Sequence, residues 1–422
     1  MLIKLSWKNI ITRPLSSSLS VILLASSLMI ISLAFLTAEQ LEEKFNKNAN
    51  QIDLVVGAKG SRLQLVLCNV FHMDHPTGNV LMKDVEFLSK HPFVKWAIPV
   101  SLGDNYKSYR IVGTDTSFIK DLYHVPLEKG HLYCNSLEIV AGSTVAENLN
   151  LEIGSTFQGS HGIGESLHDH GDFNYKVVGI LEATGDVIDQ LLLTPLKSVW
   201  DVHPKEHSKG SFELKEKSTD NHEEHEHHEK HHHKNTILEE EKEITSMLVN
   251  YTSTRGKFTL PGMVNQKKSL MAAEPAIEIQ QLFELIRPAV QVLIVLGWLL
   301  LFISIFSIFI TLINSLKDRQ VEIAMLRISG ASAIQIFSTI LLEGFMIAFI
   351  GWVFGFVFGH GLMEYLSLFI FSDYHYDFTG WILYDMEIWL FIGMLGIGMI
   401  SALYPAIRAY RIDIVKTLKN HS

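Results

Sequence analysis

The chain has 422 residues, enough for two or three domains, and 48% of them are hydrophobic; with a mean hydropathy of +0.21, this excludes a purely soluble enzyme of this size. There are 35 Lys and Arg against 45 Asp and Glu, so the formal net charge of −10 gives no indication of nucleic-acid binding. Two cysteines, Cys68 and Cys134, exclude a disulfide-rich scaffold and leave open one bridge or two separate thiols.

Four long apolar runs predict four membrane-spanning helices, at residues 15–36, 289–313, 333–358 and 388–407. At about 1.5 Å per residue, each run can cross the hydrocarbon core of a bilayer. The first run follows three cations and could also be a signal peptide. Its length and the lack of a small-x-small cleavage site favour an uncleaved anchor.

The cations predict which loops face the cytoplasm. Lys and Arg lie in residues 1–14, in the connecting segment 314–332 and in the tail 408–422, whereas the loop 364–387 has none and carries five carboxylates. Cytoplasmic loops carry an excess of Lys and Arg. We therefore expect a multi-pass protein of the inner (plasma) membrane with both termini in the cytoplasm and residues 37–288 in the periplasm.

Residues 37–288 are too long for a loop and too mixed in composition for a span, so they predict a soluble domain. Strands are expected at 52–56, 111–112, 139–141 and 175–181, and helices at 84–91 and 143–150. This alternation is typical of an α+β domain. The first and second spans are expected to continue into it as stalk helices, at 39–49 and 276–286. The expected fold is thus a membrane protein with four transmembrane α-helices and a large α+β extracytoplasmic domain between the first two.

The segment 317–330 is a short charged stretch between the second and third apolar runs. Its apolar side chains at positions i, i+3, i+4 and i+7 are Val321, Ala324, Met325 and Ile328. This stripe predicts an amphipathic helix at the membrane surface, and Gly330 is a plausible end for it. An ordinary charged loop between two spans is the alternative.

The same segment resembles the coupling segment of FtsX-like/MacB-like ABC transporter permeases (MacB, LolE and FtsX type), where R-x-x-E-I-x-x-L-R-x-x-G-A docks on a cytoplasmic ATPase. The residues in those places are Arg319, Glu322, Ile323, Leu326, Arg327, Gly330 and Ala331. Residues 145–154 look like the common core of the family's periplasmic domain, and 404–418 look like its closing motif, although Ile414 stands where a proline commonly follows the aspartate. The resemblance implies a permease subunit with a cytoplasmic ABC ATPase as its partner.

The sequence contains no G-x-x-x-x-G-K-[ST] motif. The glycine-rich stretch 57–61 lacks the adjacent Lys and hydroxyl pair that cradles a phosphate, and it is expected outside the cell. We therefore expect this chain not to be an enzyme, and ATP to be hydrolysed by a separate partner chain.

Seven histidines interleaved with glutamates lie in the charged stretch 218–235. They are His222, His225, His227, His228, His231, His232 and His233. Neutral imidazole is a good ligand for Zn²⁺ and other transition metals. A solvated low-complexity insertion with incidental metal affinity is the alternative.

A second candidate metal site lies upstream, within residues 159–172. Its ligands would be His161, His168, Asp169 and His170. Alternate residues of an extended segment point the same way, so two of these imidazoles can lie side by side; a polar loop is the alternative. Together with the strand that follows, this stretch resembles FtsX-like permeases of zinc-associated systems, which implies zinc or a periplasmic metal-binding protein as the client. His72, Asp74 and His75 are a weaker candidate.

Glu343 is a carboxylate inside the third span, where insertion of a charge costs about 2.5–3.5 kcal/mol. We favour a helix-packing or dimer contact over a proton relay. Gly351, Gly355 and Gly359 recur every four residues and predict a face for close helix packing. Four spans are too few to enclose a generous channel, so a second permease copy, in a homodimer or a heterodimer, is expected.

These expectations combine into a permease subunit that transmits ATP-driven motion to a periplasmic domain in a zinc-linked system. The alternatives are export of a lipoprotein or peptide and FtsX-like regulation of an envelope hydrolase. A metalloenzyme is disfavoured, because the histidines lack a partnered general base at a fixed spacing.

Overall fold

The computed structural model describes residues 2–12, 14–159, 173–202, 242–369 and 378–412. The chain divides into two compact units. We call residues 1–44 with 282–422 the helical unit, and residues 45–281 the sheet unit. The predicted ligands of both candidate metal sites, in 160–172 and 203–241, lie outside the described residues.

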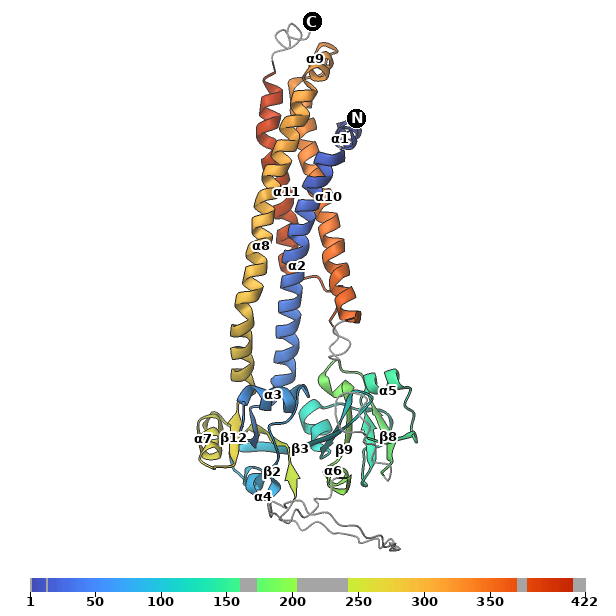
Figure 1. Ribbon diagram of the computed structural model, residues 1–422, viewed down its shortest axis with the longest axis vertical. Helices are drawn as coiled ribbons and strands as arrows, with labels where there is room; N and C mark the ends of the chain where they lie inside the picture. The colour runs from blue at the N-terminus through green and yellow to red at the C-terminus, as the bar shows by residue number, and fades with distance from the viewer. Residues whose placement is uncertain (1, 13, 160–172, 203–241, 370–377, 413–422) are drawn as a thin grey trace, which may run out of the picture. The chain divides into compact units, whose positions relative to one another are not determined.

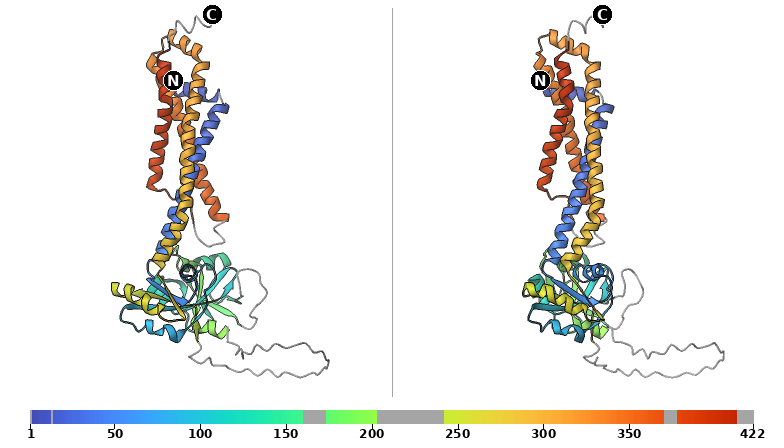
Figure 2. Two further views of the ribbon diagram at one scale, coloured as in Figure 1. Left: turned by 60° about the vertical axis from the view of Figure 1, so that its left-hand side comes forward. Right: turned by 90° about the vertical axis from the view of Figure 1, so that its left-hand side faces the viewer.

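The helical unit contains four helices long and apolar enough to cross a membrane. They are α2 (Pro14–Ala49), α8 (Pro275–Asp318), α10 (Ala333–Phe369) and α11 (Asp385–Tyr410). They run side by side (Figures 1 and 2). Two short helices, α1 (Leu2–Ile11) and α9 (Gln320–Ile328), lie at the same end of this unit as the last residues of α11. The predicted membrane architecture is confirmed.

The helical unit is packed through apolar side chains from all four long helices. The buried cluster at its centre consists of Leu24, Leu28, Ile31, Leu301, Ile308, Leu312, Ile347, Leu390, Met394 and Ala402. Glycines let the helices approach closely: a Cβ added at Gly355 would lie 2.8 Å from Leu28 Cβ, and one at Gly351 would lie 2.9 Å from Leu24 Cβ. A Cβ at Gly359 would lie 3.5 Å from Ser32 Cβ, which is an ordinary contact distance. The three predicted packing glycines thus lie along α2.

The sheet unit is built on one mixed sheet with strand order β12-β1-β11-β3-β4-β9-β6-β8-β5, and β7 pairs with β8. These strands are β1 (Leu54–Ala58), β3 (Val94–Tyr106), β4 (Tyr109–Thr114), β5 (Leu127–Gly130), β6 (Glu138–Ala141), β7 (Thr156–Phe157), β8 (Tyr175–Leu181), β9 (Leu191–Pro195), β11 (Ser246–Tyr251) and β12 (Leu270–Ala273). The pairs β4–β9 and β6–β8 are parallel, and the other pairs are antiparallel. A small second sheet pairs β2 (Val80–Leu81) with β10 (Glu243–Ile244).

Short helices complete the sheet unit. They are α3 (Arg62–Val70), α4 (Met82–Val85), α5 (Ser143–Leu149), α6 (Leu196–Val202) and α7 (Thr254–Asn265), with single turns η1 (Glu86–Leu88), η2 (Phe118–Tyr123) and η3 (Val187–Gln190). Two separate apolar clusters form the core, one around β6, β8 and α5, the other around β1, β11, β12 and α7. The unit is therefore an α+β domain, as expected.

Most elements expected in the sheet unit are present, with shifted ends. The strands expected at 52–56, 111–112, 139–141 and 175–181 correspond to β1, β4, β6 and β8. The helix expected at 84–91 is shorter, because α4 ends at Val85 and a 3₁₀ turn follows to Leu88. Cys68 is buried and Cys134 is exposed, and both are free thiols.

Candidate functional site

The turn after α9 fixes how this helix joins α10. Gly330 has φ +101°, and its N–H and that of the next residue donate to the carbonyls of Arg327 (3.2 Å) and Leu326 (3.0 Å). These are the two bonds of a Schellman motif. Ser332 and Gln335 then form a capping box, with each side chain accepting from the other's backbone N–H at 3.2 and 2.9 Å. A β-carbon at Gly330 would strain the turn.

Helix α9 buries only part of its apolar surface. Ile323 and Ala324 are buried, Ile323 in a cluster with side chains of α8, α10 and α11. Met325, Leu326 and Ile328 are exposed, with Met325 at 57% and Ile328 at 63% of their full area. An exposed apolar face on a short helix at the end of the unit is typical of a surface that binds a partner.

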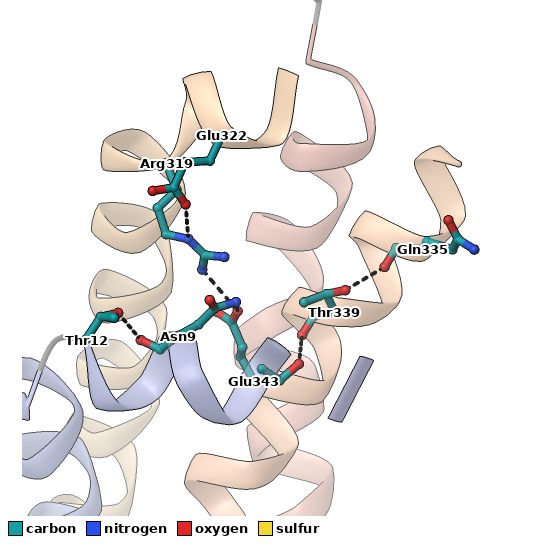
Figure 3. A network of polar contacts seen from close by, with 8 residues as sticks. Asn9, Thr12, Arg319, Glu322, Gln335, Thr339 and Glu343 are labelled. Carbon is teal, nitrogen blue, oxygen red and sulfur yellow. Dashed lines mark hydrogen bonds and ion pairs between the residues drawn. The ribbon is translucent and has the colours of Figure 1, made fainter. Parts of the chain in front are cut away.

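A buried ion pair ties α9 to α10. Arg319, which precedes α9, places Nη1 3.2 Å from Glu343 Oε1, and its Nε lies 3.3 Å from Glu322 Oε2 (Figure 3). The Glu343 and Arg319 side chains are only 4% and 15% exposed, whereas Glu322 is 69% exposed. Breaking a buried pair on one side leaves an uncompensated charge, which makes such a contact selective for one arrangement.

The same carboxylate also holds α1. Asn9 Nδ2 donates to Glu343 Oε1 at 2.5 Å, and Ser6 Oγ donates to the Thr339 carbonyl at 3.1 Å (Figure 3 shows the Asn9 contact). Both polar side chains of α1 that are buried therefore reach α10. Glu343 Oε1 accepts from α1 and from the start of α9 at once.

A small, partly open pocket of about 30 Å³ lies beside this network. Its walls include Leu5 of α1, Leu316 of α8, Ile340 of α10, and the paired Arg319 and Glu343. The ion pair is therefore bordered by apolar side chains, with a small gap beside it.

The six residues predicted to contact an ATPase differ in their environments. Glu322 and Leu326 are exposed, and Arg327 is half-buried. Ile323 is in the core, Arg319 is bound to Glu343, and Gly330 forms the turn. The exposed side chains missing from that prediction are Met325 and Ile328, which the sequence placed on the apolar stripe.

A second buried polar cluster lies between α2, α10 and α11. His360 Nε2 is 2.8 Å from Glu387 Oε1, Ser32 Oγ donates to the same oxygen at 2.8 Å, and His360 Nδ1 contacts the Gly380 carbonyl. Glu387 Oε2 is buried with no hydrogen-bond partner among the described residues. His360 and Glu387 were not identified as site residues from the sequence. The one indication in the sequence was that each is a polar side chain next to the end of an apolar run.

Among the residues that the structure describes, no three His, Cys, Asp and Glu side chains are close enough to hold a metal ion. The weaker candidate group does not converge on one point. His72 is buried in the loop after α3, and both ring nitrogens lack a hydrogen-bond partner within the described part of the chain. Asp74 and His75 are exposed, and the Asp74 carbonyl accepts from Arg110.

The environment of His72 keeps its imidazole neutral. Loss of solvation on burial, with repulsion from Arg110, lowers the pKa of His72 to about 3. Burial raises the pKa of the neighbouring Cys68 thiol, although Arg110 Nη1 at 3.4 Å opposes this. These two groups are therefore uncharged near neutral pH.

Two of three comparisons with known proteins found similarities to this chain. Residues 294–414 match the family model FtsX-like permease C-terminal. No curated protein matches the sequence. Two solved structures are similar to the chain: the periplasmic region of MacB from Actinobacillus actinomycetemcomitans (13% identity, TM-score 0.34, 57% of this chain and 98% of that one) and the extracellular domain of the noncanonic ABC-type transporter YknZ from Gram-positive bacteria (11% identity, TM-score 0.30, 53% and 99%).

The matched residues begin within α8 and include α9, α10 and α11. Arg319, Glu343 and the exposed face of α9 therefore all lie inside the region that matches this family model. The chain is a multi-pass membrane protein with an α+β domain inserted between its first two spans.

Proposed function

We propose that this chain is the membrane-spanning subunit of an ABC transporter and that a separate ATPase binds α9. The observation that carries the proposal is the exposed apolar face of α9, formed by Met325, Leu326 and Ile328, inside a domain that matches an FtsX-like permease. The chain itself is non-catalytic in this scheme, in keeping with a sequence that has no nucleotide-binding loop motif.

The distribution of Lys and Arg supports the orientation that this function needs. It favours α9 and both termini in the cytoplasm and the sheet unit in the periplasm, with the chain in the inner membrane. ATP binding would bring two ATPases together and displace α9 in each copy of a permease dimer. Helices α2 and α8 each contain residues of both units, so they are the elements able to carry the displacement outward.

Docking is tested by placing a charge on the apolar face. The full-length chain is co-expressed with a candidate ABC ATPase from the same organism and purified in mild detergent, and the Mg²⁺-dependent ATP hydrolysis that co-purifies is measured. Met325→Glu and Ile328→Glu should each reduce the retained hydrolysis about tenfold or more, because a carboxylate in a buried interface is desolvated without a partner. Phe258→Glu, at an exposed position on α7, is the control. Full retention in both α9 variants would remove the docking proposal.

We further propose a zinc-linked client, either the metal itself or a periplasmic metal-binding protein. The support is the sequence between His222 and His233, which offers seven imidazoles to a borderline-soft ion. Calorimetry on the full-length chain with Zn²⁺, with and without residues 218–235, tests it. Micromolar or tighter binding that survives the deletion favours His161, His168 and His170 as ligands. Absence of binding in both proteins would leave lipoprotein or peptide export, or regulation of an envelope hydrolase, as the function.

A further inference from the structure

Helix α1 has an unusual distribution of side chains for a helix that packs on its neighbours. Its buried residues are polar, Ser6 and Asn9, whereas Ile3, Trp7 and Ile11 are exposed at i, i+4 and i+8. Apolar side chains facing lipid hold a helix at the bilayer surface without fixing its position in the plane. Of the other apolar residues of α1, Ile10 packs against the central cluster and Leu5 lines the pocket beside Glu343. The polar contacts to α10 add directional bonds that help to fix the position of α1.

One of those contacts, from Asn9, is made to the residue that also holds α9. Glu343 Oε1 accepts from Asn9 Nδ2 at 2.5 Å and lies 3.2 Å from Arg319 Nη1. The pocket beside the pair, of about 30 Å³, leaves a small gap next to these groups. If α9 shifts and the ion pair holds, the carboxylate shifts with it, and so does the amide bonded to the same oxygen.

We propose that Glu343 is a positioning residue that makes α1 part of the moving element, because one carboxylate oxygen holds Arg319 at the start of α9 and Asn9 of α1. This deepens the proposed ATPase coupling and rests on it. Helix α1 ends at Ile11 and α2 begins at Pro14, so α1 gives α9 a second route, besides α8, to a spanning helix that continues into the sheet unit. Arg319, at the start of a predicted docking helix, then works inward, toward Glu343, rather than on the ATPase.

The test separates the α1 contact from the α9 contact. Asn9→Leu removes the amide and leaves the Arg319–Glu343 pair in place. Thr12→Val is the matched control, since the Thr12 hydroxyl, just after α1, donates locally to the Asn9 carbonyl at 2.8 Å and makes no hydrogen bond to α10 among the described residues. Asn9→Gln keeps an amide donor and should recover at least half of the effect. Spin labels at Lys4→Cys and Ser329→Cys, both exposed positions, report the α1–α9 distance in a Cys134→Ser background.

Without ATPase, the parent and Thr12→Val should give one narrow α1–α9 distance distribution, and Asn9→Leu should at least double its width. Equal widths in Asn9→Leu and Thr12→Val would overturn the proposal. This arm needs no partner protein, so it tests the Glu343 contacts even if the proposed function fails.

With the ATPase bound, a second label pair at Ser329→Cys and Arg408→Cys reports movement of α9 against α11. Nucleotide should change this distance in the parent by several ångströms while leaving the α1–α9 distance unchanged, and in Asn9→Leu the α1–α9 distance should change as well. If α9 moves in the parent and α1 does not follow, the positioning role is wrong and the coupling function stands. If the ATPase does not bind or α9 does not respond, the coupling function is wrong.

Discussion

The helical unit gives its buried carboxylates nitrogen-bearing partners, Arg319 for Glu343 and His360 for Glu387, whereas the sheet unit keeps several of its buried ionisable groups neutral. In the sheet unit, burial lowers the pKa of His72 to about 3 and raises the pKa of the Cys68 thiol and of the Tyr133 phenol. A neutral group can be replaced with little consequence for its neighbours, but a partnered carboxylate depends on where another helix lies. The contrast indicates that the paired groups of the helical unit serve to position helices.

The largest expected effect comes from removing one side chain of the Arg319–Glu343 pair. Arg319→Met leaves Glu343 buried with only Asn9 as a partner and should destabilise the helical unit by about 3 kcal/mol. Adding Glu343→Met should recover most of that loss, because a buried pair replaced by apolar side chains of similar volume is often neutral for stability. Reversible unfolding in mixed micelles measures both. If the double variant is no more stable than the single one, the two side chains do not act as a pair.

Changes in the buried cluster of Ser32, His360 and Glu387 should cause a smaller loss of stability. His360→Leu removes the contact to Glu387 and the one to the Gly380 carbonyl, and leaves Ser32 as the remaining donor to the carboxylate. A hydrogen bond to a charged group contributes about 1.5–3 kcal/mol, so we expect a loss of about 2 kcal/mol in the same unfolding assay. Ser32→Ala, which removes one hydroxyl and keeps the imidazole, should cost less than His360→Leu. The reverse order would show that the cluster is organised around Ser32.

The stability of the sheet unit should depend on pH through His72. The unfolded chain protonates His72 near its ordinary pKa of about 6.5, and the folded domain does so only near pH 3, so the unfolded state binds more protons in between. The contribution of His72 is therefore constant above about pH 6.5, and stability falls as the pH drops below it, by about 2 kcal/mol at pH 5.

Replacing the imidazole removes this dependence. His72→Phe should abolish the loss of about 2 kcal/mol between pH 7 and pH 5, measured by denaturant unfolding of the full-length chain followed through the tryptophans of the sheet unit. His75→Gln, at an exposed position in the same loop, is the control and should leave the pH dependence unchanged. An unchanged slope in His72→Phe would place the titrating group elsewhere.

The sequence predicted the spanning helices well because composition alone determines them. An uncharged run such as 15–36 has no alternative that satisfies its backbone in a bilayer. The strand β3 was missed, although it is the longest in the described sheet, because Pro99 and the Gly103–Asp104 pair resemble turn residues. The register shift between Leu102 and Asn105 accommodates Gly103 and Asp104, and Pro99 pairs in register with Met247.

The candidate site was predicted in part. The motif identified the segment around α9, and Gly330 ends the helix as expected. The motif could not show that Ile323 faces the core while Met325 and Ile328 face outward, since all three side chains are apolar. Nor could it bring together Asn9 and Glu343, which lie 334 residues apart and meet only through tertiary packing.

The smallest effects should come from neutral hydrogen bonds, one in each unit. Tyr133 Oη donates to the Thr114 carbonyl at 3.3 Å in the sheet unit, and Ser20 Oγ lies 2.8 Å from Ser307 Oγ between α2 and α8. Tyr133→Phe and Ser20→Ala should each cost about 1 kcal/mol, because neither variant leaves a buried charge without a partner. The burial that raises the pKa of Tyr133 also keeps its hydroxyl protonated, so the cost of Tyr133→Phe should be the same at pH 7 and pH 9. If Ser20→Ala instead costs as much as Arg319→Met in the same micelles, then the membrane setting, and not the charge, makes polar contacts in the helical unit matter, and the contrast between the units would need a different explanation.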